Sequence, residues 1–273
     1  MSKYYKYLQS GRYCMAVAYS RPTQKDSQRA RSEKKKHSTK ARQLLNDKAS
    51  RLQLTAIIAQ NFADSKTAFF VSPTFDDNHY PKYLKQSEYW DYCNREAKKY
   101  IARLNYIVKK RGKELRYVHC PGIGGDGRWH IHLLVDGCTA EDIVAAWTLG
   151  DANYHRLYAD KKWMTDWDWR NKKTKNVNPV AIAKYFLSNA NCRILGKHPW
   201  HASKNCERPV VQPAKVIHDS TDIQPPEGAE ILSYDKSESL FSSFECYEYI
   251  LPKPTEKRSR RGTGAETPEL GGE

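Results

Sequence analysis

The chain has 273 residues, with 46 Lys or Arg against 31 Asp or Glu, so its formal net charge is +15. This length suits one domain of about 200 residues with extensions. A balance this basic points to a polyanionic partner, most often a nucleic acid. Seven cysteines without a C-x-x-C pair disfavour a disulfide framework or zinc knuckle and favour a reducing, cytoplasmic compartment. No apolar run approaches membrane-spanning length, so we expect no contact with a membrane.

The first sixty residues predict a short strand, a basic arm and a long helix. Residues 13–19 fit a short strand. The basic run over 25–37 fits either a disordered segment or an arm that settles on phosphates. Apolar residues recur at helical spacing from Lys40 to about Phe62, which predicts a helix with its cations facing outward. A solvated face explains those cations as well as a DNA-contacting face does.

Alternating strands and helices are expected through the middle of the chain. Aromatic and β-branched runs indicate strands, and apolar stripes at helical spacing indicate helices. A glycine-rich turn, PGIGGDG, precedes one strand rather than a helix, so it indicates a hairpin loop and not a phosphate cradle. In chain order we expect a strand over 66–75, a helix over 86–111, strands over 114–120 and 129–135, a helix over 139–147 and a strand over 150–158.

The last third of the chain mixes one aromatic and basic segment with a further helix. Residues 160–176 interleave tryptophans with cations, among them Lys172 and Lys173, which suits stacked bases and phosphates of single-stranded DNA. A surface loop with its tryptophans folded inward is the alternative. Asn178 caps a helix opened by Pro179 that runs to about residue 189. Strands follow to 251, and the polar residues from 252 onward predict a disordered tail.

A pair of histidines two residues apart is the best candidate for a functional site. On a strand, His130 and His132 point to the same face, while Trp129, Ile131 and Leu133 point to the other and can enter a core. Two neighbouring imidazoles are a good start for a divalent metal site. A His-x-His pair also arises by chance, and two satisfied histidines without a ligand are the alternative.

The order of these elements predicts an α+β fold, with an antiparallel sheet flanked by helices that we expect on one face. We divide the chain into a basic N-terminal arm and helix, a central domain, a C-terminal strand extension packed on it, and the tail. The expected boundaries are 1–62, 63–209, 210–251 and 252–273.

Three segments give the chain a resemblance to a known family. Phe69–Phe75, Trp129–Leu133 and Ala183–Leu187 are similar, in this order, to the three motifs of rolling-circle replication initiators in the HUH endonuclease superfamily, which small bacterial plasmids, phages and integrated elements encode. The second motif holds the paired histidines and the third a nucleophilic tyrosine. The resemblance covers roughly residues 30–250, and the matching flanks are Gln60–Phe62, Trp147–Gly150, Trp200–Asn205 and Arg208–Pro209.

This resemblance implies an α+β HUH nuclease with a ferredoxin-like sheet that nicks and rejoins single-stranded origin DNA. Tyr185 would be the nucleophile and would form a 5′-phosphotyrosine. Mn²⁺ or Mg²⁺ at His130 and His132 would polarise the scissile phosphate, with imidazole ligands favouring Mn²⁺. Lys184 is the cation nearest to the tyrosine in sequence. No acid stands in the stretch before the histidine pair, so His119 is our candidate for the third metal ligand.

The resemblance also implies partners. Single-stranded or hairpin origin DNA would be the substrate, and a host polymerase would extend the free 3′ end. No G-x-x-x-x-G-K-[ST] motif is present, so a host helicase is expected to open the duplex. The cations that we assign to DNA are Arg128, Lys172, Lys173, Lys204 and Arg208.

Two departures from the family pattern leave a second class of function open. The lysine that members often carry three residues after the tyrosine is Ser188 here, and the position of a second tyrosine is Ala181. The alternatives are a weakened enzyme that acts as a single-stranded or hairpin DNA-binding module on the same fold, or a related transposase or relaxase. Without the resemblance, Tyr185 would be assigned to a core and Lys204 and Arg208 to the surface.

Overall fold

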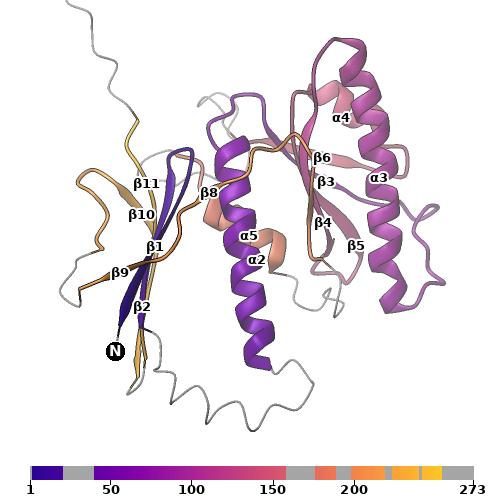
Figure 1. The fold of residues 1–273 in the computed structure, drawn as a ribbon. Coiled ribbons are helices and arrows are strands. Elements are labelled where there is room, and N and C mark those ends of the chain that lie inside the picture. Colours follow the sequence, from indigo (N-terminus) through magenta and orange to yellow (C-terminus); the bar gives the residue numbers. More distant parts are fainter. Residues whose placement is uncertain are drawn as a thin grey trace, which may run out of the picture.

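The computed structural model describes residues 2–20, 40–157, 176–188, 198–218, 223–239 and 242–253. These residues form two antiparallel sheets and four helices, an α+β fold as predicted (Figure 1). The helices are α2 (Lys40–Asn61), α3 (Gln86–Lys110), α4 (Ala140–Ala146) and α5 (Pro179–Leu187). The strands are β1 (Lys3–Ser10), β2 (Tyr13–Ser20), β3 (Phe69–Pro73), β4 (Arg116–Ile123), β5 (Trp129–Asp136), β6 (Ala152–Arg156), β7 (His201–Ala202), β8 (Val210–Val211), β9 (Lys215–Ile217), β10 (Glu230–Ser239) and β11 (Ser242–Ile250).

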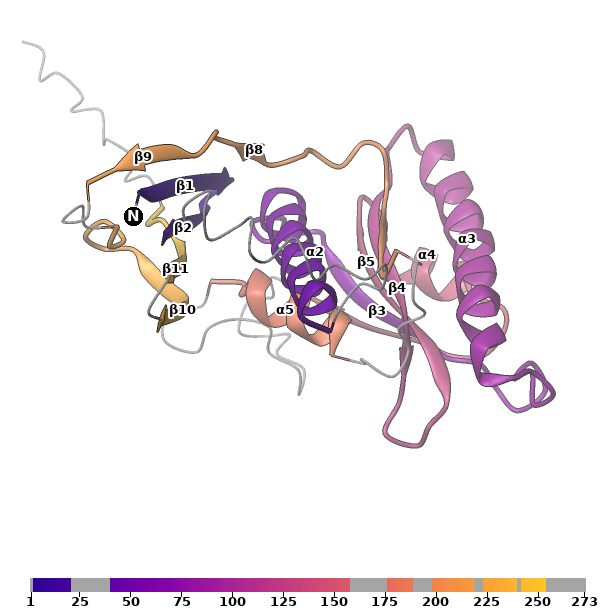
Figure 2. The same ribbon diagram turned by 60° about the horizontal axis from the view of Figure 1, so that its bottom comes forward.

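The central sheet has the strand order β6-β3-β5-β4-β7, and its middle is the β4–β5 hairpin that the glycine-rich turn predicted. Helices cover both of its faces. The helices α3 and α4 pack on one face, and α2 and α5 pack on the other (Figures 1 and 2). The expectation of helices on one face only is therefore wrong, because strands with apolar residues on both sides need two covering layers.

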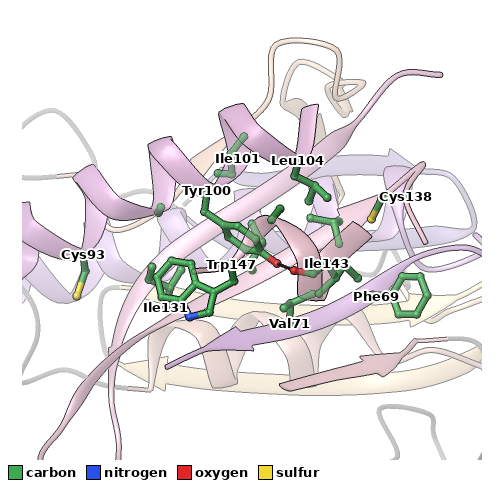
Figure 3. Packing of buried hydrophobic residues seen from close by; sticks show 14 of the residues in the cluster. Phe69, Val71, Cys93, Tyr100, Ile101, Leu104, Ile131, Cys138, Ile143 and Trp147 are labelled. Carbon is green, nitrogen blue, oxygen red and sulfur yellow. Dashed lines mark hydrogen bonds between the residues drawn. The ribbon is translucent and has the colours of Figure 1, made fainter. Parts of the chain in front are cut away.

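The core between α3, α4 and the central sheet is built from alternating residues of β5 and from the apolar stripe of α3. Figure 3 shows Tyr100 of α3 against Trp147, with ring centroids 5.2 Å apart. The Tyr100 hydroxyl donates a hydrogen bond of 2.9 Å to the carbonyl of Ile143. This bond satisfies a buried polar group and fixes α4 against α3.

A second sheet has the order β10-β11-β2-β1-β8, with β9 also paired to β1. The predicted strand over 13–19 lies in β2, but its partner β1 and the pairing of β2 with β11 were not predicted. This sheet packs on the side of α2 and α5 that faces away from the central sheet (Figure 2). The two helices are therefore a middle layer between two sheets.

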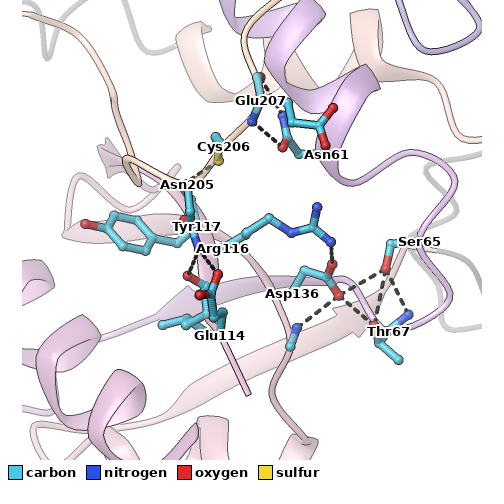
Figure 4. A network of polar contacts seen from close by, with 12 residues as sticks. Asn61, Ser65, Thr67, Glu114, Arg116, Tyr117, Asp136, Asn205, Cys206 and Glu207 are labelled. Carbon is cyan, nitrogen blue, oxygen red and sulfur yellow. Dashed lines mark hydrogen bonds and ion pairs between the residues drawn. The ribbon is translucent and has the colours of Figure 1, made fainter. Parts of the chain in front are cut away.

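A polar network holds the far end of β5. The carboxylate of Asp136 accepts hydrogen bonds from Ser65 and Thr67 in the loop after α2 and from Arg116 at the start of β4 (Figure 4). Asp136 is 4 % exposed, so these donors replace the water that it loses on folding. The network fixes β5, the histidine strand, relative to β3 and β4.

The remaining elements follow the sequence closely. The structure confirms the predicted helices of the middle segment, the Thr139 cap of α4 and the Asn178 cap of α5. The basic run over 25–37, nearly all of 160–176 and residues 254–273 lie outside the described residues. The four boundaries of our division stay predictions. No helix among the described residues is long and apolar enough to cross a membrane.

Candidate active site

The pairing of β4 with β5 sets the direction of the histidine pair. His132 lies opposite Cys120 and His130 opposite Gly122, so all four residues share the face of the central sheet that α2 and α5 cover. Trp129, Ile131 and Leu133 enter the core on the other face, as strand alternation predicted.

The two histidines and Tyr185 are in contact. The ring centroids of His130 and His132 are 4.6 Å apart, and the ring planes are nearly perpendicular at 87°. The ring centroid of Tyr185 lies 4.8 Å from that of His132, with 63° between the planes. His132 therefore lies between the other histidine and the tyrosine, and α5 brings its hydroxyl-bearing ring to the metal-binding pair predicted on β5.

His132 is buried without hydrogen bonds. It is 1 % exposed, and neither its Nδ1 nor its Nε2 has a partner among the described residues. Burial, followed by the nearby His130, lowers the pKa of His132 to about 3. Burial also lowers the pKa of His130, whose Nδ1 lies 3.4 Å from the carbonyl oxygen of Arg128. Both imidazoles are neutral at physiological pH, which is the form that binds metal ions.

Gly122 supplies the space that the imidazoles occupy. A Cβ atom at this position would lie 2.5 Å from Nε2 of His132 and 3.0 Å from Nε2 of His130. Both Nε2 atoms therefore converge over the glycine, and a side chain there would displace the rings. The position where family members often carry an acid is filled here by the histidines themselves.

The helix α5 holds Tyr185 from both sides. Val180 packs in the core under the second sheet, whereas Ile182, Ala183 and Phe186 pack against the central sheet. The Tyr185 ring is half-buried and lies edge to face on Phe70, with 5.7 Å between centroids. Burial raises the pKa of Tyr185, and the Cys120 thiol adds to the rise. The phenol form is therefore favoured, and catalysis would require removal of its proton.

Lys184 points elsewhere. It is exposed, while the neighbouring Tyr185 is half-buried against β3 and β5. Adjacent helical residues diverge by about 100°, which accounts for the difference. The structure therefore does not bring Lys184 to the tyrosine ring.

The expectation that His119 faces the pair is wrong. His119 lies opposite Leu133, whose side chain is in the α3 core, so its own side chain is on the other face from His132. Its ring instead lies 5.1 Å from that of His201 and 6.2 Å from that of Tyr117. Burial is the main reason that its pKa is lowered to about 3. The structure makes His119 a buried neutral side chain rather than a neighbour of the metal site.

Arg128 is engaged within the protein. Its guanidinium donates to Asp77 at 2.7 Å and to the carbonyl of Phe75 at 2.9 Å, and it lies 4.7 Å from the ring centroid of Tyr80. These contacts tie the turn between β4 and β5 to the loop after β3. A DNA contact by Arg128 would have to share a guanidinium that already has two acceptors.

The other predicted DNA cations do not surround the histidine pair. Lys204 and Arg208 are exposed, and Lys204 follows Ser203, whose backbone N–H bonds to Tyr117. Gly122 lies about 16 Å further along β4 than Tyr117. Lys172 and Lys173 lie outside the described residues.

The pair fits part of a metal site. Neutral imidazoles with free Nε2 atoms are suitable ligands for a divalent ion. Among the described residues, however, no group of three His, Cys, Asp or Glu side chains could hold a metal. A bound ion would therefore take its other ligands from water, from a substrate phosphate or from elsewhere in the chain.

Two residues of the site were not singled out from the sequence. Phe70 and Phe186 enclose His132, with ring centroids 5.9 Å and 5.7 Å from it. Phe186 was visible as the neighbour of Tyr185, but only the pairing of β3 with β5 brings Phe70 to this face.

Residues 68–190 match a family model of replication-associated proteins, the ORF2 type. The matched segment contains the histidine pair, Gly122 and Tyr185, and it spans the central sheet apart from β7. No curated protein and no solved structure gives a significant match to the chain. The segment that builds the candidate site is thus similar to replication-associated proteins.

Proposed function

We propose that the protein initiates rolling-circle replication by nicking single-stranded origin DNA and rejoining it through Tyr185. The observation that carries this proposal is the contact of Tyr185 with His132, which in turn contacts His130. A nucleophile beside a pair of metal-ligating side chains suits attack on a phosphodiester. The match to replication-associated proteins over the same residues supports this choice of substrate.

In the forward reaction the Tyr185 oxygen attacks the scissile phosphorus and loses its proton to water or a base. The bond from phosphorus to the 3′ oxygen breaks, and that oxygen takes up a proton to become a free 3′-OH. The product is a 5′-phosphotyrosine. Because one phosphoester replaces another, a 3′-OH can later attack the phosphotyrosine and rejoin the DNA without an external energy source.

The residues around Tyr185 define its part in this reaction. Phe70 and Phe186 exclude water from one side of the His132 ring and restrict the tyrosine to a narrow range of positions. Because burial raises its pKa, the tyrosine is protonated at neutral pH until substrate is bound. Early loss of the proton is thereby disfavoured.

His130 and His132 are the residues that would hold a divalent ion, Mn²⁺ in preference to Mg²⁺. When bound, such an ion supplies a positive charge that polarises the phosphate oxygens and stabilises the phenolate. The free 3′-OH is the substrate of a polymerase, and a helicase would supply unwound DNA. Both are expected from the host.

The proposal is tested by incubating the protein with labelled single-stranded oligonucleotides from its own genetic element, with Mn²⁺ or with chelator. We expect a covalent protein–DNA adduct that needs the metal and is absent from Tyr185→Phe. Tyr83→Phe is the matched control, because Tyr83 is 85 % exposed and distant in the chain from the site. An equal adduct from Tyr185→Phe would refute the assignment of the nucleophile.

One observation favours a second candidate function. The described residues include no third protein ligand beside the histidine pair. A chain with a weakened site would act as a binding module for single-stranded or hairpin DNA on the same fold. Salt-sensitive binding of those oligonucleotides without any adduct, in Mn²⁺ and in Mg²⁺, would favour this candidate over the nuclease.

A further inference from the structure

The solvent-facing side of α3 carries a row of cations that the candidate site does not use. Its opposite side packs on the central sheet, and none of the described elements covers the outer side (Figure 1). The exposed residues recur three or four positions apart, so they share one face. They are Arg95, Lys98, Lys99, Ala102, Tyr106, Lys109 and Lys110, and Lys113 follows the helix; we call them the α3 basic face.

Few acidic groups neutralise this face. Glu96 is 7 % exposed and pairs with Lys99 at 2.9 Å and Arg95 at 3.6 Å. Among the described residues, Lys98, Lys109 and Lys113 form no ion pair. The helix dipole favours cations in the last turn, which accounts for Lys109 but not for those near the middle of the helix. The positive charge therefore extends along most of α3.

The turn at residues 203–205 lies beside the end of this face. Asn205 donates hydrogen bonds of 3.3 Å to Glu114 and to the carbonyl of Leu115, in the segment that follows Lys113 (Figure 4). Lys204 is exposed in this turn. The cation that we had assigned to the histidine site thus lies near the C-terminal end of the α3 basic face.

We propose that the α3 basic face binds the phosphate backbone of duplex DNA, such as the stem of an origin hairpin. The cations from Arg95 to Lys110 extend over about 22 Å of a straight helix. Both strands of a duplex together present about one charge per 1.7 Å of axis, twice the density of a single strand. Tyr106, 63 % exposed, is the one large aromatic on this face among the described residues, so the face offers little stacking for unpaired bases.

The α3 basic face and the histidine pair lie on opposite sides of the central sheet. A duplex held on α3 would therefore leave the other side free for a single strand to reach Tyr185. The inference rests on the proposed function only in taking DNA as the polyanion. The two remain separable, because duplex binding needs neither metal nor the tyrosine.

The test measures binding of a labelled duplex of about 20 base pairs to the full chain at several salt concentrations. Lys109→Ala/Lys113→Ala removes two charges from the α3 basic face. Lys215→Ala/Lys236→Ala removes two exposed lysines from strands of the second sheet and is the matched control. Thermal unfolding of both double variants checks that each is folded.

We expect the α3 double variant to weaken duplex binding at least roughly tenfold near 0.1 M salt. Its plot of log affinity against log salt should flatten by about 1.8, or 0.9 for each lost contact. The control should match the wild type. Equal weakening in both variants, weakening in neither, or no duplex binding by the wild type would each overturn the inference.

The proposed nuclease is tested separately, by adduct formation of the wild-type protein on single-stranded DNA. An adduct with no α3-dependent duplex binding would leave the nuclease standing and remove this inference. Duplex binding that depends on α3, with no adduct, would do the reverse.

Discussion

The ring of Tyr185 lies edge to face against the ring of His132, with 4.8 Å between centroids. The two residues come from α5 and β5, and Phe70 of β3 contacts both. Three elements distant in the chain therefore meet at one point. Because His132 is almost fully buried there without a hydrogen-bond partner, the contact depends on packing around the ring and on the empty space over Gly122.

Gly122→Ala should disrupt the histidine pair. The new Cβ would lie 2.5 Å from Nε2 of His132, and a buried ring has little room to move. We expect Mn²⁺ affinity, measured by calorimetry, to fall at least roughly tenfold and stability to fall by about 1–3 kcal/mol. Gly125→Ala is the matched control, because no atom lies within 4 Å of a Cβ there. Unchanged Mn²⁺ binding in Gly122→Ala would argue against a metal at this pair.

The attachment of the second sheet to α2 should depend on Glu248. Its carboxylate accepts hydrogen bonds of 2.7 Å from Tyr13 and 2.9 Å from Arg51, and its side chain is 3 % exposed. Glu248→Ala would leave both donors buried without an acceptor, so we expect the free energy of unfolding in urea to fall by about 3 kcal/mol.

The exposed pair of Lys48 and Asp235 joins the same two elements and serves as the control. Asp235→Ala should cost about 0–1 kcal/mol, because solvent screens an exposed pair. If the two substitutions had equal effects, Glu248 would not be the main attachment of this sheet.

Acid should destabilise the protein partly through His119. Its pKa is about 3 in the fold and about 6.5 in the unfolded chain, so between these values the unfolded state binds more protons. The stability that His119 contributes is complete above pH 6.5 and is lost as the pH falls toward 3. At pH 5 the loss is about 2 kcal/mol.

His119→Phe keeps a ring between Tyr117 and His201 but cannot be protonated. Between pH 7 and pH 5 we expect the variant to lose about 2 kcal/mol less stability than the wild type. His218→Gln, at an exposed position, controls for the removal of a histidine. A variant as acid-sensitive as the wild type would contradict the role of His119.

Local sequence patterns predicted the elements that carry the site but not all of their contacts. Strand alternation correctly placed His130 and His132 on one face and Ile131 in the core on the other. It failed for His119, because the face of a residue on β4 depends on its register with β5. Cys120, and not His119, lies opposite His132, and a shift of one residue reverses the face.

The second sheet shows the same limit over a longer range. The strand β1 alternates tyrosines with other residues but has no marked turn or apolar run of its own. Its place is fixed by pairing with β2, β8 and β9, and β2 pairs in turn with β11 near the other end of the chain. Pairings between distant segments leave no local pattern in a single sequence, whereas Asn178 and Pro179 do mark the start of α5.

The central claim is that Tyr185 attacks the phosphodiester, and mapping the attachment site of the DNA tests it most directly. The wild-type protein would be incubated with its single-stranded origin DNA and Mn²⁺ and digested with protease and nuclease. The nucleotide-bearing peptide would then be sequenced by mass spectrometry. We predict a single modified peptide, with the phosphate on Tyr185. A phosphate on any other residue, or no modified peptide under conditions where the DNA is cut, would contradict the claim.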